Sequence, residues 1–155
     1  MQMVKGYIVF DMDGTIADLY GVENWLDMLR AEDDTPYKVA KPLYVMEELN
    51  LVLNQLKELG YVIAVTSWLA KDSTKAYDKK VRKAKREWLD KHNFPYDELH
   101  LVKYGTTKAN CTRGKCKNQI LVDDNEKVRK GWKLGLTINA KDDNIIVELM
   151  KLYNN

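Results

Sequence analysis

The chain has 155 residues, of which 45% are hydrophobic and 31% are charged, a balance typical of one globular domain and not of a disordered or fibrous chain. The formal net charge of +2 hides an uneven distribution, because residues 1–50 carry 4 basic and 10 acidic side chains. No apolar run approaches the roughly 20 residues of a membrane-spanning helix, and the first residues lack the pattern of a signal peptide. We therefore expect no membrane partner and a cytoplasmic location.

Five short apolar stretches, each bounded by polar residues, predict strands at 3–10, 61–67, 98–105, 119–124 and 134–139. Helical patterns lie between and after them, at 43–59, 72–92 and 143–153, and a short helix is expected within 22–30. Strands that alternate with helices predict a three-layer, Rossmann-like α/β fold with a mainly parallel five-stranded sheet. We expect residues 1–155 to form a single domain.

Polar side chains follow four of the five predicted strands, at the point where each strand ends. Ligands bind beyond the carboxyl ends of the strands in open parallel sheets, so the sequence predicts a site at this edge. Two carboxylates as close as Asp11 and Asp13 repel each other unless a cation or a shared proton neutralises them. The residues expected there, strand by strand, are Asp11 and Asp13, Thr66 and Ser67, Thr106, Thr107 and Lys108, and Asp123 and Asp124.

The stretch "DMDGT" at 11–15 has two other interpretations. A calcium loop of the EF-hand type needs Gly at its sixth position and Glu at its twelfth, where this chain has Ile16 and Val22. A simple turn explains an Asp-Gly pair, but it does not explain the polar residues that end the other three strands. We therefore favour a site that holds a cation.

Four motifs in order along the chain carry a resemblance to a known family: "DMDGT" at 11–15, "VTS" at 65–67, an isolated lysine, and "LVDD" at 121–124. Together they resemble the haloacid dehalogenase-like (HAD) phosphohydrolases over nearly the whole chain. Among these, the chain looks most like the branch of the 5′(3′)-deoxyribonucleotidases and related small phage and bacterial phosphatases. The resemblance implies a Mg²⁺-dependent phosphomonoester hydrolase that acts through an aspartyl-phosphate on nucleotides or other small phosphate esters.

The same resemblance implies a role for each motif residue. Asp11 would be the nucleophile, and Asp13 would protonate the leaving alcohol and later deprotonate the attacking water. Thr66, assisted by Ser67, would bind a phosphate oxygen, and Lys108 would neutralise charge on the phosphate and the nucleophile. Mg²⁺ would be held by Asp11, by the backbone carbonyl of Asp13 and by a carboxylate from the fourth strand.

Two of these assignments have alternatives within the chain. In the family pattern the metal-binding Asp is the second residue of the pair, so Asp124 is favoured as the ligand and Asp123 would hold the lysine. The lysine itself is either Lys103 or Lys108. We favour Lys108, because Lys103 lies inside the predicted third strand while Lys108 follows it, where a helix can begin.

The short segment 16–41 predicts a small, cap-like insertion, much smaller than the helical cap of the deoxyribonucleotidases. Aromatic residues gather near the predicted rim, and they either stack on a base of the substrate or pack the insertion onto the core. Of these, Trp68 is expected to contact the substrate. The others are Tyr20, Trp25 and Tyr37.

The helical segment 71–92 carries 9 basic and 4 acidic side chains. Such a helix either tracks a nucleic-acid backbone or presents an ordinary solvated face. The first interpretation favours a phosphatase that acts on polynucleotide ends. A further alternative is a catalytically silent binding or regulatory protein that keeps the fold, although it would have no reason to retain the complete set of motif residues.

Overall fold

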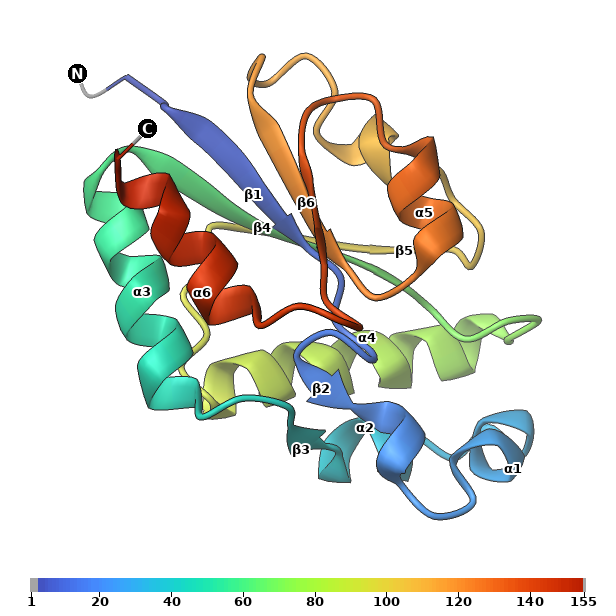
Figure 1. Ribbon diagram of the computed structural model, residues 1–155. Helices are drawn as coiled ribbons and strands as arrows, with labels where there is room; N and C mark the ends of the chain where they lie inside the picture. Colours follow the sequence, from blue (N-terminus) through green and yellow to red (C-terminus); the bar gives the residue numbers. More distant parts are fainter. Residues whose placement is uncertain (1–2, 155) are drawn as a thin grey trace.

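The structure is a computed structural model that describes residues 3–154, and its centre is a parallel sheet of five strands (Figure 1). The strands lie in the order β5-β4-β1-β6-β7, and each neighbouring pair is parallel. The predicted Rossmann-like α/β fold is therefore confirmed. The strand bounds are Gly6–Phe10 for β1, Tyr61–Trp68 for β4, Glu98–Val102 for β5, Gln119–Asp123 for β6 and Thr137–Asn139 for β7.

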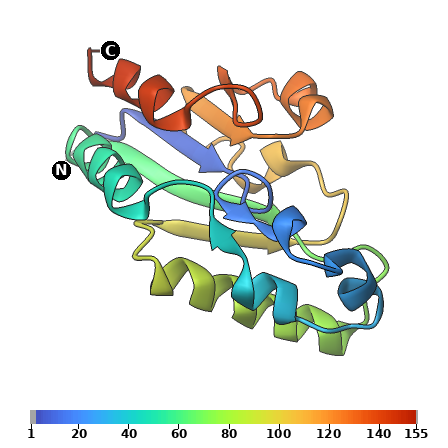
Figure 2. The same ribbon diagram turned by 60° about the horizontal axis from the view of Figure 1, so that its bottom comes forward.

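Helices cover both faces of the sheet, which gives the three layers (Figures 1 and 2). Side chains of β1 alternate between the two faces: Ile8 and Phe10 pack in the cluster with α3 and α6, while Tyr7 and Val9 pack with residues near α5. Burial on both faces explains why the central strands β1, β4 and β6 appear in the sequence as mainly apolar runs. The helices are α3 (Met46–Glu58), α4 (Lys75–Lys91), α5 (Glu126–Gly131) and α6 (Ile145–Met150), with 3₁₀ helices η2 (Lys108–Cys111) and η3 (Lys151–Asn154).

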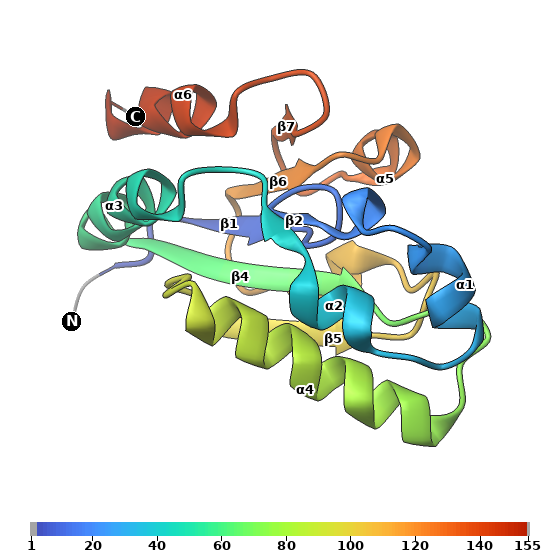
Figure 3. The same cartoon turned by 90° about the horizontal axis from the view of Figure 1, so that it is seen from below.

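The segment between β1 and α3 forms a small insertion beyond the strand ends, alongside α4 (Figure 3). Its two short strands pair antiparallel, and one of its helices, α2, was not predicted from the sequence. The proline in the first turn of α2 suits that position, because its fixed backbone angle matches the helix and its missing N–H is not needed there. The elements are β2 (Ala17–Asp18), η1 (Leu19–Gly21), α1 (Trp25–Arg30), α2 (Thr35–Val39) and β3 (Lys41–Pro42).

Hydrogen bonds attach this insertion to α4 at both ends of the helix. The Glu32 carboxylate accepts bonds from the backbone N–H and the hydroxyl of Thr74, the N-cap residue of α4, at 3.1 and 2.9 Å. The Tyr77 hydroxyl donates to the backbone carbonyl of Asp33 at 2.8 Å. Near the other end, Trp88 Nε1 donates to the carbonyl of Ala40 at 2.8 Å. These contacts and the buried side chains between them fix the insertion on the core.

The strand order identifies where a ligand is expected to bind. From β1 the chain proceeds to β4 and β5 on one side of the sheet, and it later returns to β6 and β7 on the other side. Ligand sites of open α/β sheets lie at the carboxyl ends of the strands where this direction reverses, here between β1 and β6. Asp11 follows β1 directly, and Asp123 is the last residue of β6. No helix among residues 3–154 is long and apolar enough to cross a membrane.

Candidate active site

A tight turn follows β1 and sets the direction of the first two acidic side chains. The carbonyl of Met12 accepts backbone N–H bonds from Thr15, Ile16 and Ala17 at 3.2, 3.0 and 3.0 Å. Gly14 has a φ of +80°, and a Cβ at this position would overlap the carboxylate of Asp124. Only glycine satisfies both conditions, which accounts for the glycine of the "DMDGT" stretch.

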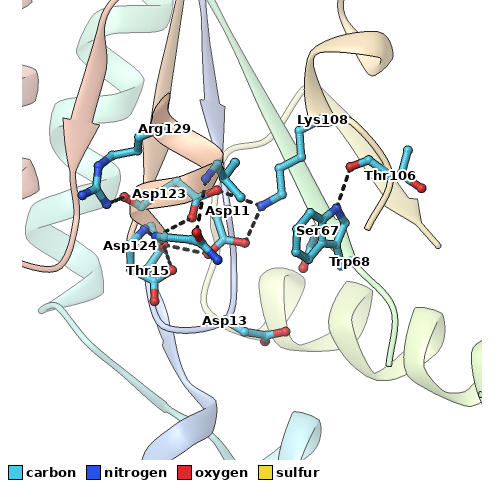
Figure 4. A network of polar contacts seen from close by, with 12 residues as sticks. Asp11, Asp13, Thr15, Ser67, Trp68, Thr106, Lys108, Asp123, Asp124 and Arg129 are labelled. Carbon is cyan, nitrogen blue, oxygen red and sulfur yellow. Dashed lines mark hydrogen bonds and ion pairs between the residues drawn. The ribbon is translucent and has the colours of Figure 1, made fainter. Parts of the chain in front are cut away.

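Lys108 connects the first and fourth motifs (Figure 4). Its Nζ lies 2.8 Å from Asp11 Oδ1 and 2.9 Å from Asp123 Oδ2, and it stands 5.2 Å from the centre of the Trp68 ring. Burial by itself would lower the pKa of Lys108, but the two carboxylates outweigh burial and raise it. Lys108 is the first residue of η2, in agreement with the prediction that a helix begins there. Lys103 is an exposed residue directly after β5 and not inside the strand.

Asp123 and Asp124 have different surroundings. Asp123 is buried and uses both oxygens, accepting from Lys108 at Oδ2 and from the backbone N–H of Asn125 at Oδ1, 2.9 Å in each case. Asp124 is partly exposed and faces the cavity. Its backbone N–H donates to the Thr15 hydroxyl at 3.2 Å, and that hydroxyl donates to Asp11 Oδ2 at 2.9 Å.

Thr15 was not predicted as a site residue. It is fully buried, yet its hydroxyl joins the Asp11 side chain to the backbone of the fourth motif. The signal was present in the sequence, because Thr15 closes the same five-residue stretch as the two aspartates.

Carboxylate oxygens of Asp11, Asp123 and Asp124 lie within 4.8 Å of one another and form a group that can hold a metal ion. Burial and the charge of Asp11 raise the pKa of Asp124 to about 7. Burial acts in the same direction on Asp11, but Lys108 outweighs it and lowers that pKa. A shared proton between Asp11 and Asp124 thus relieves the repulsion in the absence of a cation. An all-oxygen donor set of this kind suits a hard ion such as Mg²⁺.

Asp13 points away from this group, toward α4, where it meets a lysine that sequence analysis did not single out (Figure 4 shows the Asp13 side chain). Lys85 Nζ lies 2.8 Å from Asp13 Oδ2 and also donates to Ser67 Oγ at 2.7 Å. Burial raises the pKa of Asp13, and the ammonium of Lys85 offsets only part of that effect. Lys85 is one of the basic residues of the segment 71–92. Lys85 lies one helical turn from Val81 and from Leu89, and this spacing indicates that it shares their buried face.

The end of β4 carries the second motif and the tryptophan that follows it. Ser67 and Trp68 are the last two residues of β4, and both line the cavity. Thr66 is fully buried, and its hydroxyl has no hydrogen-bond partner among the described residues. The Trp68 ring is held by a bond from Nε1 to the carbonyl of Thr106 at 2.8 Å and packs against Tyr104 with ring centres 5.0 Å apart.

A cavity of about 550 Å³ joins these groups. Its floor contains Asp11, Asp13, Ser67, Lys108, Asp123 and Asp124, with Trp68 at the side. Of the residues predicted at this edge, Thr66, Thr106 and Thr107 do not line the cavity. One part of the wall belongs to the insertion, and another part is the loop that leads into α4. The apolar wall residues are Leu19, Tyr20, Trp25, Leu26, Leu29, Leu69 and Ala70, and charged residues of the wall include Arg30, Glu32, Lys71 and Asp72.

No protein-family model matches the sequence, and no curated protein matches it either. Among solved structures, the fold is similar to the D,D-heptose 1,7-bisphosphate phosphatase from Burkholderia thailandensis, with a TM-score of 0.60 and 11% sequence identity. The similarity covers 97% of this chain and 100% of the phosphatase chain. At this level of identity the similarity shows a shared fold and no more.

Proposed function

We propose that this protein is a Mg²⁺-dependent phosphomonoester hydrolase of the HAD type that acts through an aspartyl-phosphate on Asp11. The observation that carries the proposal is the buried 2.8 Å contact of Asp11 with Lys108, next to the carboxylates of Asp123 and Asp124. Phosphoryl transfer needs a positioned nucleophile and positive charge around the transferred group. Asp11 supplies the first, and Lys108 with a cation supplies the second.

The donor set fits Mg²⁺, with Asp11, Asp124 and the backbone carbonyl of Asp13 as ligands. Asp124 is the better fourth-strand ligand, because it is partly exposed in the cavity, whereas Asp123 is buried and holds Lys108. Asp123 then orients Lys108. When bound, the ion would neutralise phosphate charge and help to orient the ester.

The residues of the chain divide the reaction into two displacements. In the first, a carboxylate oxygen of Asp11 attacks phosphorus, the bond to the ester oxygen breaks, and Asp13 donates a proton to the departing alcohol. In the second, Asp13 takes a proton from water, the water oxygen attacks phosphorus, and the bond to Asp11 breaks. Phosphate leaves, and Asp11 returns to its starting state.

Lys108 and the second motif provide the contacts with the phosphate group. Ser67 lines the cavity and can donate its hydroxyl proton to a phosphate oxygen. Thr66, which the family resemblance puts first, is fully buried in this state. We therefore assign the direct contact to Ser67 and a supporting position to Thr66.

The substrate we propose is a small phosphate ester with an apolar or aromatic leaving group, which includes the nucleotides expected for the deoxyribonucleotidase-like branch. A cavity of about 550 Å³ has the size of a site for a small organic molecule. Trp25, Leu26, Leu29 and Trp68 line it. Such a wall accepts a base or an aryl group better than a sugar, whose hydroxyls need hydrogen-bond partners.

A second candidate activity, on polynucleotide ends, is favoured by one observation. Lys71 lines the cavity, and the helix that begins after it carries the exposed residues Lys75, Lys79 and Lys80. Basic side chains in such a row can contact successive phosphates of a strand, and binding through them weakens steeply as salt rises.

A panel of phosphate monoesters tests the proposal, with phosphate release measured in Mg²⁺ and in EDTA. Hydrolysis of p-nitrophenyl phosphate and of nucleoside monophosphates that requires Mg²⁺ and is lost in Asp11→Asn supports it. Absence of hydrolysis of every ester would favour the catalytically silent alternative. A 5′- or 3′-phosphorylated oligonucleotide hydrolysed faster than the mononucleotide at low salt, but not at high salt, would favour the polynucleotide activity.

A further inference from the structure

Lys85 is a fully buried lysine at the centre of the apolar face of α4. Val81 and Leu89, one helical turn before and after it, are completely buried as well. Removing an ammonium group from water is unfavourable, and an apolar side chain at such a position is often at least as stabilising. Packing of the helix therefore does not explain why a lysine stands here.

The three N–H groups of the Lys85 ammonium all have acceptors outside α4. They reach Asp13 Oδ2 at 2.8 Å, Ser67 Oγ at 2.7 Å and the backbone carbonyl of Trp68 at 2.8 Å. The ring of Tyr37, from the insertion, lies 5.0 Å from the same nitrogen. A lysine ammonium has three donors, so its hydrogen-bonding capacity is used completely by the ends of β1 and β4.

Two of these bonds, to Asp13 and to Ser67, restrict side chains that line the cavity. Because Asp13 Oδ2 is bound to Lys85, its Oδ1 is the oxygen that can meet a leaving group. Because Ser67 Oγ accepts a bond from Lys85, its own proton is free to point into the cavity, where Ser67 is part of the wall. Lys85 itself is not part of that wall.

We infer that Lys85 is a positioning residue for phosphoryl transfer: it fixes the carboxyl of Asp13 and the hydroxyl of Ser67 without touching the substrate. This inference rests on the proposed function. It also separates Lys85 from the exposed lysines of α4, because a side chain with no exposed surface and three occupied donors cannot contact a nucleic acid.

The first test is Lys85→Met, which keeps an unbranched side chain of nearly the same length and removes its donors, with Lys83→Met on the exposed face of α4 as the matched control. We expect kcat/KM for an alkyl phosphate, which reports the step in which the alcohol leaves, to fall roughly 100-fold, the lower end of what a positioned acid contributes. The loss on p-nitrophenyl phosphate should be much smaller, because nitrophenolate leaves without a proton. Lys83→Met should match the wild type on both substrates.

The second test is chemical rescue of Lys85→Ala. Ethylammonium can enter the space left by the side chain and donate to the same acceptors, so it should restore activity on the alkyl phosphate in a saturable way. Tetramethylammonium has the same charge but no N–H, and it should not restore activity. Nor should ethylammonium rescue a variant that combines Lys85→Ala with Asp13→Asn.

Thermal unfolding of each variant completes the experiment by showing which of them fold. Equal losses on the two substrates in a folded variant, or a failure of ethylammonium to rescue, would overturn the inference. If neither Lys85→Met nor Lys85→Ala folds, Lys85 acts on stability and the inference is wrong. A wild-type protein that hydrolyses no ester overturns the proposed function and the inference together, whereas an active wild type with equal losses overturns the inference alone.

Discussion

Replacement of Asp124 by Asn should make the metal-free protein more stable, and the gain should increase with pH. The pKa of Asp124 is raised to about 7 in the folded state, by burial and by Asp11, whereas an unfolded Asp titrates near 4. A raised folded-state pKa means that the fold holds this proton more tightly than the unfolded chain does. The stability that protonated Asp124 contributes is therefore complete below about pH 4 and is lost as pH rises through about 7.

The size of the effect follows from the shift and from the exposure of the group. Between about pH 5 and pH 7 the unfolded chain has released this proton and the folded state has not, so stability falls by about 1.4 kcal/mol per pH unit, or about 3 kcal/mol in total. Asp124 is partly exposed, and water screens such interactions. We therefore expect about half of that value, roughly 1.5 kcal/mol.

The assay is denaturation by guanidinium chloride in EDTA at about pH 5 and about pH 8, for the wild type and for Asp124→Asn. Comparison of the two proteins cancels the other titrating groups, including His92, whose pKa is lowered by burial. The free energy of unfolding of Asp124→Asn relative to wild type should rise by roughly 1.5 kcal/mol between the two pH values. Added Mg²⁺ should stabilise only the wild type strongly. Parallel pH dependence in the two proteins would refute this reasoning.

Further substitutions and metal removal test the remaining assignments. Asp11→Asn should reduce turnover to background without loss of the fold, which circular dichroism can check. In Asp13→Asn, kcat/KM should fall about 10²-fold or more for alkyl phosphates and less for p-nitrophenyl phosphate, and equal losses in kcat/KM would argue against a role as the acid. Lys108→Ala should cost at least about 10²-fold in kcat, whereas Lys103→Ala should leave it unchanged, and the reverse order would mean that the third motif is misassigned. EDTA should abolish hydrolysis and Mg²⁺ should restore it, and full activity in EDTA would contradict the metal assignment.

The central strands of the sheet were predictable because they are buried on both faces. A strand such as β1, with all five residues buried, appears in the sequence as a short apolar run whatever its neighbours are. The predicted strand at 134–139 is longer than the observed β7, which begins at Thr137. Helix α2 was missed because its residues, Thr35–Val39, show no extended apolar period, and its packing against α4 through Tyr37 and Tyr77 determines its position.

The candidate site was predictable where residues follow strand ends, and not where a partner comes from a distant helix. Parallel strands bring Asp11 and Asp123 to one edge regardless of loop details. The place of Lys85 on the apolar face of α4 indicates that it is buried, but it does not identify the carboxylate 72 residues earlier in the chain as its partner. The choice between Thr66 and Ser67 was open because both carry a hydroxyl, and only the structure shows that Ser67 lines the cavity and Thr66 is buried.

Chemical trapping of the phosphorylated enzyme tests the central claim most directly. The Asp13→Asn variant, in which breakdown of the intermediate should be slow, is mixed with p-nitrophenyl phosphate and Mg²⁺ and then denatured in acid. Borohydride reduces an aspartyl-phosphate to the alcohol, and mass spectrometry of the peptides locates the reduced residue. We predict reduction at Asp11, dependent on Mg²⁺ and absent when Asp11→Asn is added to the variant. Reduction at another residue, or release of nitrophenol with no modification at Asp11, would contradict the account.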